Sequence, residues 1–458
     1  MLLFENSVEI PLPSWGGDPL TDLDVAIRER IGDGSVPIRC AVTDASASVL
    51  RVDVGSISCN AALPARPRSI FAHSVRPRSG GAFNIAFVVP TGVGSEIGGH
   101  AGDAGPAARL LGGMCDTLIT HPNVVNASDI NEMPLNGLYV EGSILSRFLL
   151  GTVGLRRVRS NRVLVVIDEH ADEFFTDSAI NSVNGARASY GLDCPRVVTM
   201  RPPVKLRARF APSGRAAGRV EGLAPLLDIL TELRDEYDAV SISSVIDVPH
   251  EFHTEYFEKH GEMINPWGGV EAMLTHTIST LLDVPSAHSP MFESQEISNL
   301  YVGVVDPRMA AEAVSVTFLQ CTLKGLSTAP RVVTDPADFG RDGTLDAGDV
   351  SCLVIPDGCL GLPTLAALLQ GIPVIAVEEC QTIMKNDLGA LPWRPGQFRR
   401  VANFWEAAGI VATMKAGISP ESVRRPIAGV AIDRRIDDAS SIVKCNRTGE
   451  TTCGLDAG

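Results

Sequence analysis

The sequence predicts an α/β protein with two Rossmann-like parallel-sheet domains and a small N-terminal α+β module. Three observations support this fold class. The chain of 458 residues exceeds the length of one ordinary domain core. Short apolar, β-branched runs alternate with helix-like stretches from residue 83 onward, which is typical of parallel strands covered on both faces. Hydrophobic residues make up 45% and charged residues 20% of the chain, as in globular proteins with a sizeable core.

Residues 1–80 are expected to form the small α+β module and a linker. Residues 21–31 have the character of a helix. Two β-rich runs follow at 37–44 and 48–57, joined by a short turn of alanine and serine. Residues 62–81 are rich in proline, arginine and glycine, which indicates a linker.

Residues 81–305 are expected to form the central Rossmann-like domain. Its strands are predicted in the apolar runs 84–90, 116–121, 136–142, 161–168, 195–200 and 237–245. Helix-like stretches at 105–114 and 222–237 lie between some of these runs. Strands separated by helices favour parallel pairing, because a parallel connection needs a crossover of a dozen or more residues.

Residues 306–436 are expected to form a second Rossmann-like domain. It should begin with a helix at 309–326. Its strands are predicted at 330–335, 350–358 and 372–379. Residues 437–458 are polar and lack periodicity, so we expect a disordered tail there.

The composition argues against several partners and locations. A net charge of −15 would repel a nucleic-acid backbone or an anionic membrane surface. The amino terminus lacks a basic region, an apolar run of signal length and a small-residue cleavage site. No run reaches roughly 18 uninterrupted apolar residues, so no membrane span is expected. Ten cysteines without a Cys-x-x-Cys pair favour a reduced, cytoplasmic protein.

A glycine-rich stretch, TGVGSEIGGHAGDAG, follows the first strand of the central domain. Such a turn can bind phosphate through bare backbone N–H groups. The spacing of Gly92, Gly94 and Gly98 is one residue longer than the dinucleotide fingerprint, however, and Glu96 and Asp103 would repel a phosphate. We therefore interpret the stretch as a substrate loop, with Gly92, Gly94 and Glu96 among its binding residues.

Polar side chains follow the next two strands. His121, Asn123 and Asn126 come directly after one strand, and Glu141 ends the next. Ligands of α/β proteins bind at the carboxyl ends of parallel strands. We predict that the two asparagines orient the substrate and that His121 and Glu141 are catalytic. An asparagine-rich turn and a capping carboxylate are the structural alternatives.

Three histidines lie close together in VPHEFHTEYFEKHGE. His250, His253 and His260, with Glu251 and Glu255, contain enough ligands for a divalent metal ion. The spacing is not that of the zinc-hydrolase helix, which pairs histidines four residues apart around a glutamate. Solvated helix histidines are therefore favoured, and the three remain weak metal candidates.

The stretch NPWGGVEAMLTHT is expected to form a turn that leads into a helix. Asn265, Gly268 and Gly269 are predicted to contact the substrate. Glu271 falls in the first helical turn, near free backbone N–H groups, and is a catalytic candidate. His276 lies five residues farther on, about 140° around the helix, so it does not share a face with Glu271.

His288 is expected in a proline-bounded loop, PSAHSP, where its side chain would reach a cleft. We predict a catalytic role for it, because imidazole titrates near neutral pH. A structural role for the histidines is the alternative.

The unit IPDGCLGLPTLAALLQGIPVIAVEE is similar to the nucleotide-sugar half of two-domain glycosyltransferases. The likeness rests on Gly361, Pro363, Ala367, Gly371, Pro373, Val374 and Ile375. The ribose-binding glutamate of those enzymes would fall near Ala366, where no acid is present. Asp357 and Gly361 are nevertheless included among the predicted substrate-binding residues.

Several long motifs resemble an uncharacterised family of cyanobacteria, other bacteria and plant plastids. They are PTGVGSEIGGHAGDAGPAARLL, THPNVVNASD, YVEG, NPWGGVEAMLTHT and VPSAHSP. The likeness spans about residues 83–379. That family has no established activity, so the resemblance implies a soluble, small-molecule setting and transfers no catalytic residues.

The leading hypothesis is an enzyme that acts on a small, polar, carboxylated metabolite by side-chain acid/base chemistry in an interdomain cleft. The substrate would be held by the glycine-rich loop at 92–105, Asn123 and Asn126. His121 or His288 would move the proton with help from Glu141 or Glu271. The alternatives are a nucleotide-sugar-dependent transferase and a non-catalytic metabolite-binding regulatory protein. The cofactor remains unknown, a homo-oligomer is left open, and neither nucleic acid nor membrane is an expected partner.

Overall fold

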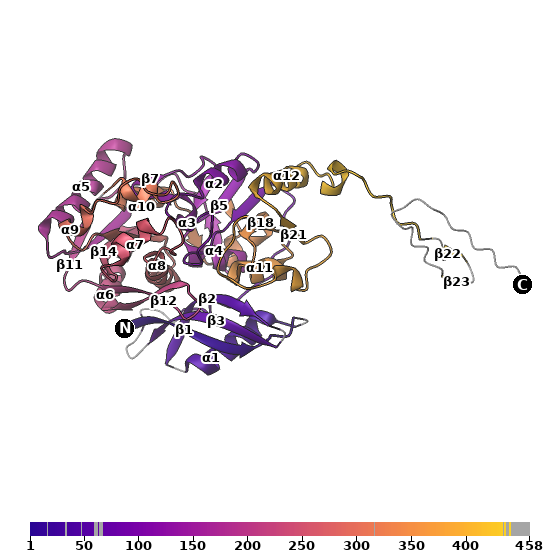
Figure 1. Cartoon of the computed structure of the whole chain (residues 1–458), viewed down its shortest axis with the longest axis horizontal. Helices are drawn as coiled ribbons and strands as arrows, with labels where there is room; N and C mark the ends of the chain where they lie inside the picture. Colours follow the sequence, from indigo (N-terminus) through magenta and orange to yellow (C-terminus); the bar gives the residue numbers. More distant parts are fainter. Residues whose placement is uncertain are drawn as a thin grey trace, which may run out of the picture. The chain divides into compact units, whose positions relative to one another are not determined.

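The computed structural model of the chain describes residues 1–15, 17–32, 34–46, 48–58, 63, 67–315, 317–433, 435–436 and 439–440. Met1–Ala408 form one compact unit, whose helices and strands are labelled in Figure 1, and the chain from Gly409 onward belongs to a second unit. Apart from residues 439–440, the tail expected at 437–458 lies outside the described residues.

A ten-stranded mixed sheet joins the N-terminal module to the central part of the chain. Its strands are β1 (Leu2–Pro11), β2 (Ser35–Ala45), β3 (Val49–Ser58), β10 (Val163–Asp168), β11 (Val197–Met200), β12 (Lys205–Phe210), β13 (Ala216–Glu221), β14 (Ala239–Asp247), β15 (Ser286–Met291) and β19 (Leu360–Gly361). The order is β11-β10-β14-β12-β13-β1-β3-β2-β19, with β15 paired to β14. The pairings of β10 with β11, and of β14 with β10, β12 and β15, are parallel, and the others are antiparallel.

A six-stranded sheet is parallel throughout. Its strands are β4 (Asn84–Phe87), β5 (Thr117–Thr120), β8 (Gly137–Tyr139), β18 (Val350–Pro356), β20 (Val374–Val377) and β21 (Phe398–Val401). The order is β21-β20-β18-β4-β5-β8. Strands from both sides of residue 305 therefore share this sheet. The α/β class is confirmed, but the expected pair of Rossmann-like domains is not.

Short strands complete the described sheets. They are β6 (Asn126–Ala127) with β7 (Ile130–Asn131), β9 (Gly154–Arg156) with β16 (Arg331–Val333) and β17 (Thr344–Leu345), and β22 (Arg435–Ile436) with β23 (Ala439–Ser440). The described α-helices are α1 (Pro19–Ile31), α2 (Gly105–Gly112), α3 (Pro122–Val125), α4 (Gly142–Leu149), α5 (Glu173–Tyr190), α6 (Leu223–Glu232), α7 (Phe252–Glu258), α8 (Gly268–Leu282), α9 (Gln295–Ser298), α10 (Leu319–Ser327), α11 (Leu362–Gln370) and α12 (Phe404–Lys415).

Two local expectations are wrong. The helix expected at 309–326 is interrupted: a short 3-10 helix, η2 (Ala310–Ala313), precedes α10. His288 lies in strand β15 and not in a loop. Because β15 pairs only with β14, it is an edge strand, where the missing N–H of Pro290 is tolerated.

Apolar burial explains how the helices cover the sheets. Leu20, Leu23 and Ile27 on one face of α1 pack with buried residues of β1, β2 and β3. Helices α6 and α8 share a core with β14 on one face of the ten-stranded sheet. On the opposite face, Ser241 of β14 hydrogen-bonds Thr322 of α10 at 3.2 Å. Helix α8 is thus held over the sheet with its first turn facing the strand ends.

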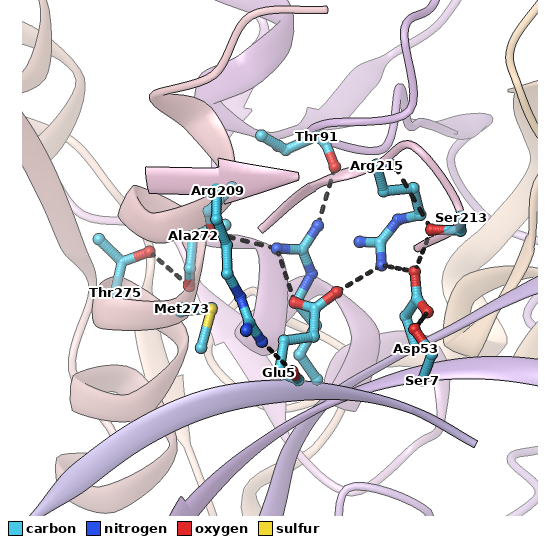
Figure 2. A network of polar contacts seen from close by, with 12 residues as sticks. Glu5, Ser7, Asp53, Thr91, Arg209, Ser213, Arg215, Ala272, Met273 and Thr275 are labelled. Carbon is cyan, nitrogen blue, oxygen red and sulfur yellow. Dashed lines mark hydrogen bonds and ion pairs between the residues drawn. The ribbon is translucent and has the colours of Figure 1, made fainter. Parts of the chain in front are cut away.

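A buried ion network ties the N-terminal strands to the rest of the unit (Figure 2). Arg215 Nη1 lies 2.7 Å from Glu5 Oε1 and 3.0 Å from Asp53 Oδ2, and all three side chains are 1% exposed. Arg39 Nη1 is 3.8 Å from Glu5 Oε2. Arg39 also donates to the carbonyls of Thr91, at 2.8 Å, and Gly269, at 3.1 Å. The network therefore holds the start of the glycine-rich loop and the start of α8 against one sheet.

Replacing Arg215 with Met should lower the free energy of unfolding by about 3–5 kcal/mol, because two buried carboxylates lose their partner. Urea unfolding of the full chain measures this loss. Arg51→Met is the matched control: Arg51 pairs with Glu9 on the surface, where solvent screens the charges, so its loss should be much smaller. Equal losses for the two variants would contradict a structural role for the buried network.

Candidate functional site

A cavity of about 160 Å³ opens beside the carboxyl ends of β4, β5 and β8. We name it the histidine cavity after its titratable lining, which is His100, His121, Glu141, Glu271, His276 and His288. On the side of the ten-stranded sheet, the cavity is lined by helix α8 and strand β15. Residues far apart in the sequence thus meet at one strand-end site, which is where ligands of α/β proteins bind.

The structure brings most of the sequence-predicted site residues to this cavity. Those that line it are Gly92, His121, Asn123, Asn126, Glu141, Asn265, Gly268, Glu271 and His288. Asn123 Nδ2 donates to the carbonyls of Val89 and Gly98 at 2.9 Å each, and so braces the glycine-rich loop. Asn265 Oδ1 accepts from the N–H of Gly268 at 3.3 Å, at the start of α8. The side chains of Asn123 and Asn265 therefore line the cavity and also hold the backbone of its wall in place.

Glu141 and His276 form the first carboxylate–histidine pair. Glu141 is the N-cap of α4, and its Oε2 accepts from the N–H groups of Ser143, at 2.9 Å, and Ile144, at 3.1 Å. His276 Nε2 lies 3.3 Å from the other oxygen, Oε1. Burial lowers the pKa of His276, although Glu141 opposes that shift. A Cβ at Gly142 would lie 2.6 Å from His276 Nε2, so only glycine there allows the imidazole to approach.

His121 is a neutral hydrogen-bond donor. The N–H of Val89 donates to its Nε2 at 3.1 Å, so the ring proton of the neutral form resides on Nδ1. Burial, with a smaller effect from the nearby His276, lowers the pKa of His121 to about 4. At neutral pH this geometry suits donation to a substrate oxygen better than proton abstraction.

Glu271 and His288 form the second pair. His288 Nδ1 lies 3.0 Å from Glu271 Oε1, and its Nε2 lies 2.8 Å from Ser244 Oγ. This connectivity matches a serine–histidine–carboxylate triad. The serine is fully buried, however, and the His288 side chain is 0% exposed, whereas Glu271 is 26% exposed. Glu271 is therefore the solvent-exposed end of this chain of three, and the other two residues orient its carboxylate.

Sequence reasoning missed Ser244 and a polar cluster at the far side of the cavity. Tyr256 Oη lies 2.7 Å from His100 Nδ1 and donates to Glu312 Oε1 at 3.1 Å. The N–H of Ala101 donates to the same carboxylate oxygen at 2.6 Å. Burial raises the pKa of Glu312 to about 7 and lowers that of His100 to about 4. The one sequence signal for Ser244 is its polar side chain within the apolar strand AVSISSV.

Three predicted binding residues of the loop and helix lie elsewhere. A Cβ at Gly94 would meet Ile264 at 2.9 Å, so this glycine allows close packing. Glu96 is exposed and pairs with Arg308 at 2.8 Å. Gly269 faces the backbone of β13, where an added Cβ would lie 2.3 Å from Ala216, so it lets α8 approach that strand.

The two C-terminal binding candidates and the histidine trio are also outside the cavity. Asp357 pairs with Arg400 at 2.8 Å. Gly361 is the N-cap of α11 and lines a separate cavity that adjoins the histidine cavity. Of the three histidines at 250–260, His253 is buried with its Nε2 3.7 Å from Glu293. Within the described residues, no three His, Cys, Asp or Glu side chains are grouped to hold a metal ion.

Fold and site together define an α/β protein with carboxylate–histidine pairs at the ends of parallel strands. Residues 84–424 match the family described as "Protein of unknown function (DUF3326)", and the chain belongs to that family. It is similar to a protein of Synechococcus sp. that is named "uncharacterized lipoprotein". The two are 31% identical over 351 residues, which cover 75% of this chain and 94% of the relative.

The family resemblance expected from the sequence is thereby confirmed. No solved structure matches the chain. Among the helices of the described residues, none has the length and apolar character needed to cross a membrane.

The protonation state of His121 can be measured directly. In ¹⁵N-edited NMR of histidine-labelled protein, its ring should show the Nδ1–H tautomer at neutral pH and should titrate around pH 4. His121→Gln assigns the signal. Titration near the ordinary histidine value of ~6.5, or an Nε2–H tautomer, would contradict the donor role.

Proposed function

We propose that this protein is an enzyme that transfers protons at a carbon next to a carbonyl or carboxyl group of a small polar metabolite. The observation that carries the proposal is the pair of carboxylate–histidine couples, Glu141–His276 and Glu271–His288, around one cavity. Paired titratable groups held by burial and hydrogen bonds are typical of general acid/base sites. The cleft lies at strand ends within one compact unit.

Each group has a role in this reaction. Glu271, whose carboxylate is 26% exposed, accepts the proton from the carbon. The electron pair moves onto the adjacent oxygen, and the Nδ1–H of His121 donates to that oxygen as its negative charge develops. Glu271 or His276, which is held beside Glu141, then returns a proton to carbon as the electron pair moves back from the oxygen. His288 and Ser244 keep the Glu271 carboxylate in one orientation.

We also propose the cytoplasm as the location. Among the described residues, six buried cysteines form no disulfide, which suits a reducing compartment. They are Cys40, Cys194, Cys321, Cys352, Cys359 and Cys380. The Synechococcus relative is named a lipoprotein, and that name describes the relative and not this chain. Fractionation of the native host with an antibody to this chain tests the location.

Deuterium exchange tests the reaction while the substrate is still unidentified. The full chain is incubated in D₂O with pooled polar carboxylated metabolites, and mass spectrometry follows incorporation of deuterium at carbon. We expect one compound class to exchange. Glu271→Gln should slow that exchange by ~10²–10⁴-fold, the usual contribution of a general base.

Glu232→Gln, an exposed change at the end of α6, is the matched control and should leave the exchange rate unaltered. Binding of a metabolite without exchange would instead support the non-catalytic binding hypothesis. Unchanged exchange in Glu271→Gln would exclude this carboxylate as the base.

A further inference from the structure

A second and larger cavity adjoins the histidine cavity. Its volume is about 320 Å³, within the range of ~300–1,000 Å³ that small-molecule sites occupy. The two cavities share Ala101, Asn126, Asn265, Glu271 and His288 in their walls. A ligand that reaches Glu271 can therefore extend from one cavity into the other.

Four aromatic rings contribute to the wall of this second cavity, which we name the aromatic chamber. Phe257, Trp267, Phe292 and Phe318 line it, together with aliphatic side chains such as Met291. The centroids of the Phe292 and Phe318 rings lie 5.6 Å apart. Trp267 packs against Tyr256 at 5.2 Å, edge to face. These contacts hold the rings in place around an apolar space before any ligand arrives.

The charged lining of the chamber is acidic. Glu271, Glu293 and Glu312 contribute carboxyl groups, and no lysine or arginine occurs among its described lining residues. The other titratable lining residues are His253, 3.7 Å from Glu293, and His288, which bonds Glu271. The donors to Glu312 from Ala101, Tyr256 and Asn265 all reach Oε1. Its Oε2 carries no hydrogen bond within the described part of the chain.

Glu271 is arranged in the same way, with Oε1 bonded to His288. Each of these two carboxyl groups thus keeps one oxygen for a ligand. The lining as a whole would repel an anion and favour a cation.

We propose that the aromatic chamber binds an apolar group of the substrate that bears a protonated amine. Aromatic faces attract an ammonium group through their quadrupoles, and carboxylates nearby supply the opposite charge. The inference names the substrate class of the proposed enzyme. It rests on the proposed function only for placing the reacting carbon at Glu271.

Three small probes separate the two features of this ligand. Benzylamine carries both ring and charge, benzyl alcohol only the ring, and methylamine only the charge. Isothermal titration calorimetry of the full chain is run at pH 8, because burial raises the pKa of Glu312 to about 7. Benzylamine should bind with an affinity about tenfold higher than either of the other two, equivalent to about 1.4 kcal/mol. Equal affinity for benzylamine and benzyl alcohol would overturn the cation, and equal affinity for benzylamine and methylamine would overturn the aromatic contact.

Variants of chamber residues test whether benzylamine binds in the chamber. Glu312→Gln should reduce the advantage of benzylamine over benzyl alcohol, and Phe292→Ala should reduce its advantage over methylamine. Glu296→Gln, exposed on α9, is the control and should change neither ratio. Unaltered ratios in both chamber variants would place binding elsewhere and overturn the proposal, as would absence of benzylamine binding at millimolar concentration.

The wild-type probe series remains decisive even if a variant fails to fold. Its outcome is also independent of turnover. Benzylamine binding without deuterium exchange would refute the proposed reaction alone. Exchange without benzylamine binding would refute the chamber alone.

Discussion

The buried ion network around Arg215 is the constraint on which the rest of the unit depends. A guanidinium and two carboxylates, each 1% exposed, are stable together only while all three stay paired. Glu5 comes from β1 and Asp53 from β3, so the pairing fixes the N-terminal strands against the segment that precedes β13. Arg39 extends the same network to the carbonyls of Thr91 and Gly269.

Those two carbonyls mark the start of the glycine-rich loop and the start of α8. Both segments line the candidate site, so the network fixes one edge of it. Glu271 is in the first turn of α8, where free N–H groups stabilise a carboxylate. Burial in the cavity is the largest cause of the shifted pKa values of its histidines. The pKa values of His100 and His121 both fall to about 4. A water-poor cleft of this kind strengthens each remaining polar contact.

The sequence predicted much of the fold and site, for local reasons. Continuous apolar runs identified β4, β5, β10 and β14, because buried parallel strands need no polar alternation. Polar residues that directly follow apolar runs placed Glu141 and His121 at the ends of strands. The same logic missed β1, since Glu5 is charged and periodicity assigns charged residues to the surface. It also placed His288 in a loop, because a proline within a strand is tolerated only at a sheet edge, and edges are set by pairing.

By itself the sequence determined which chemical groups the site contains and the elements that carry most of them. Only the tertiary structure decided which groups meet. Glu271 pairs with His288 across 17 residues, and Glu312 accepts from Ala101 across 211. Strand β4 likewise pairs with β18 from the other end of the chain. Local periodicity reports only whether a residue is buried and on which face, whereas pairing follows from sheet order and side-chain packing over long separations.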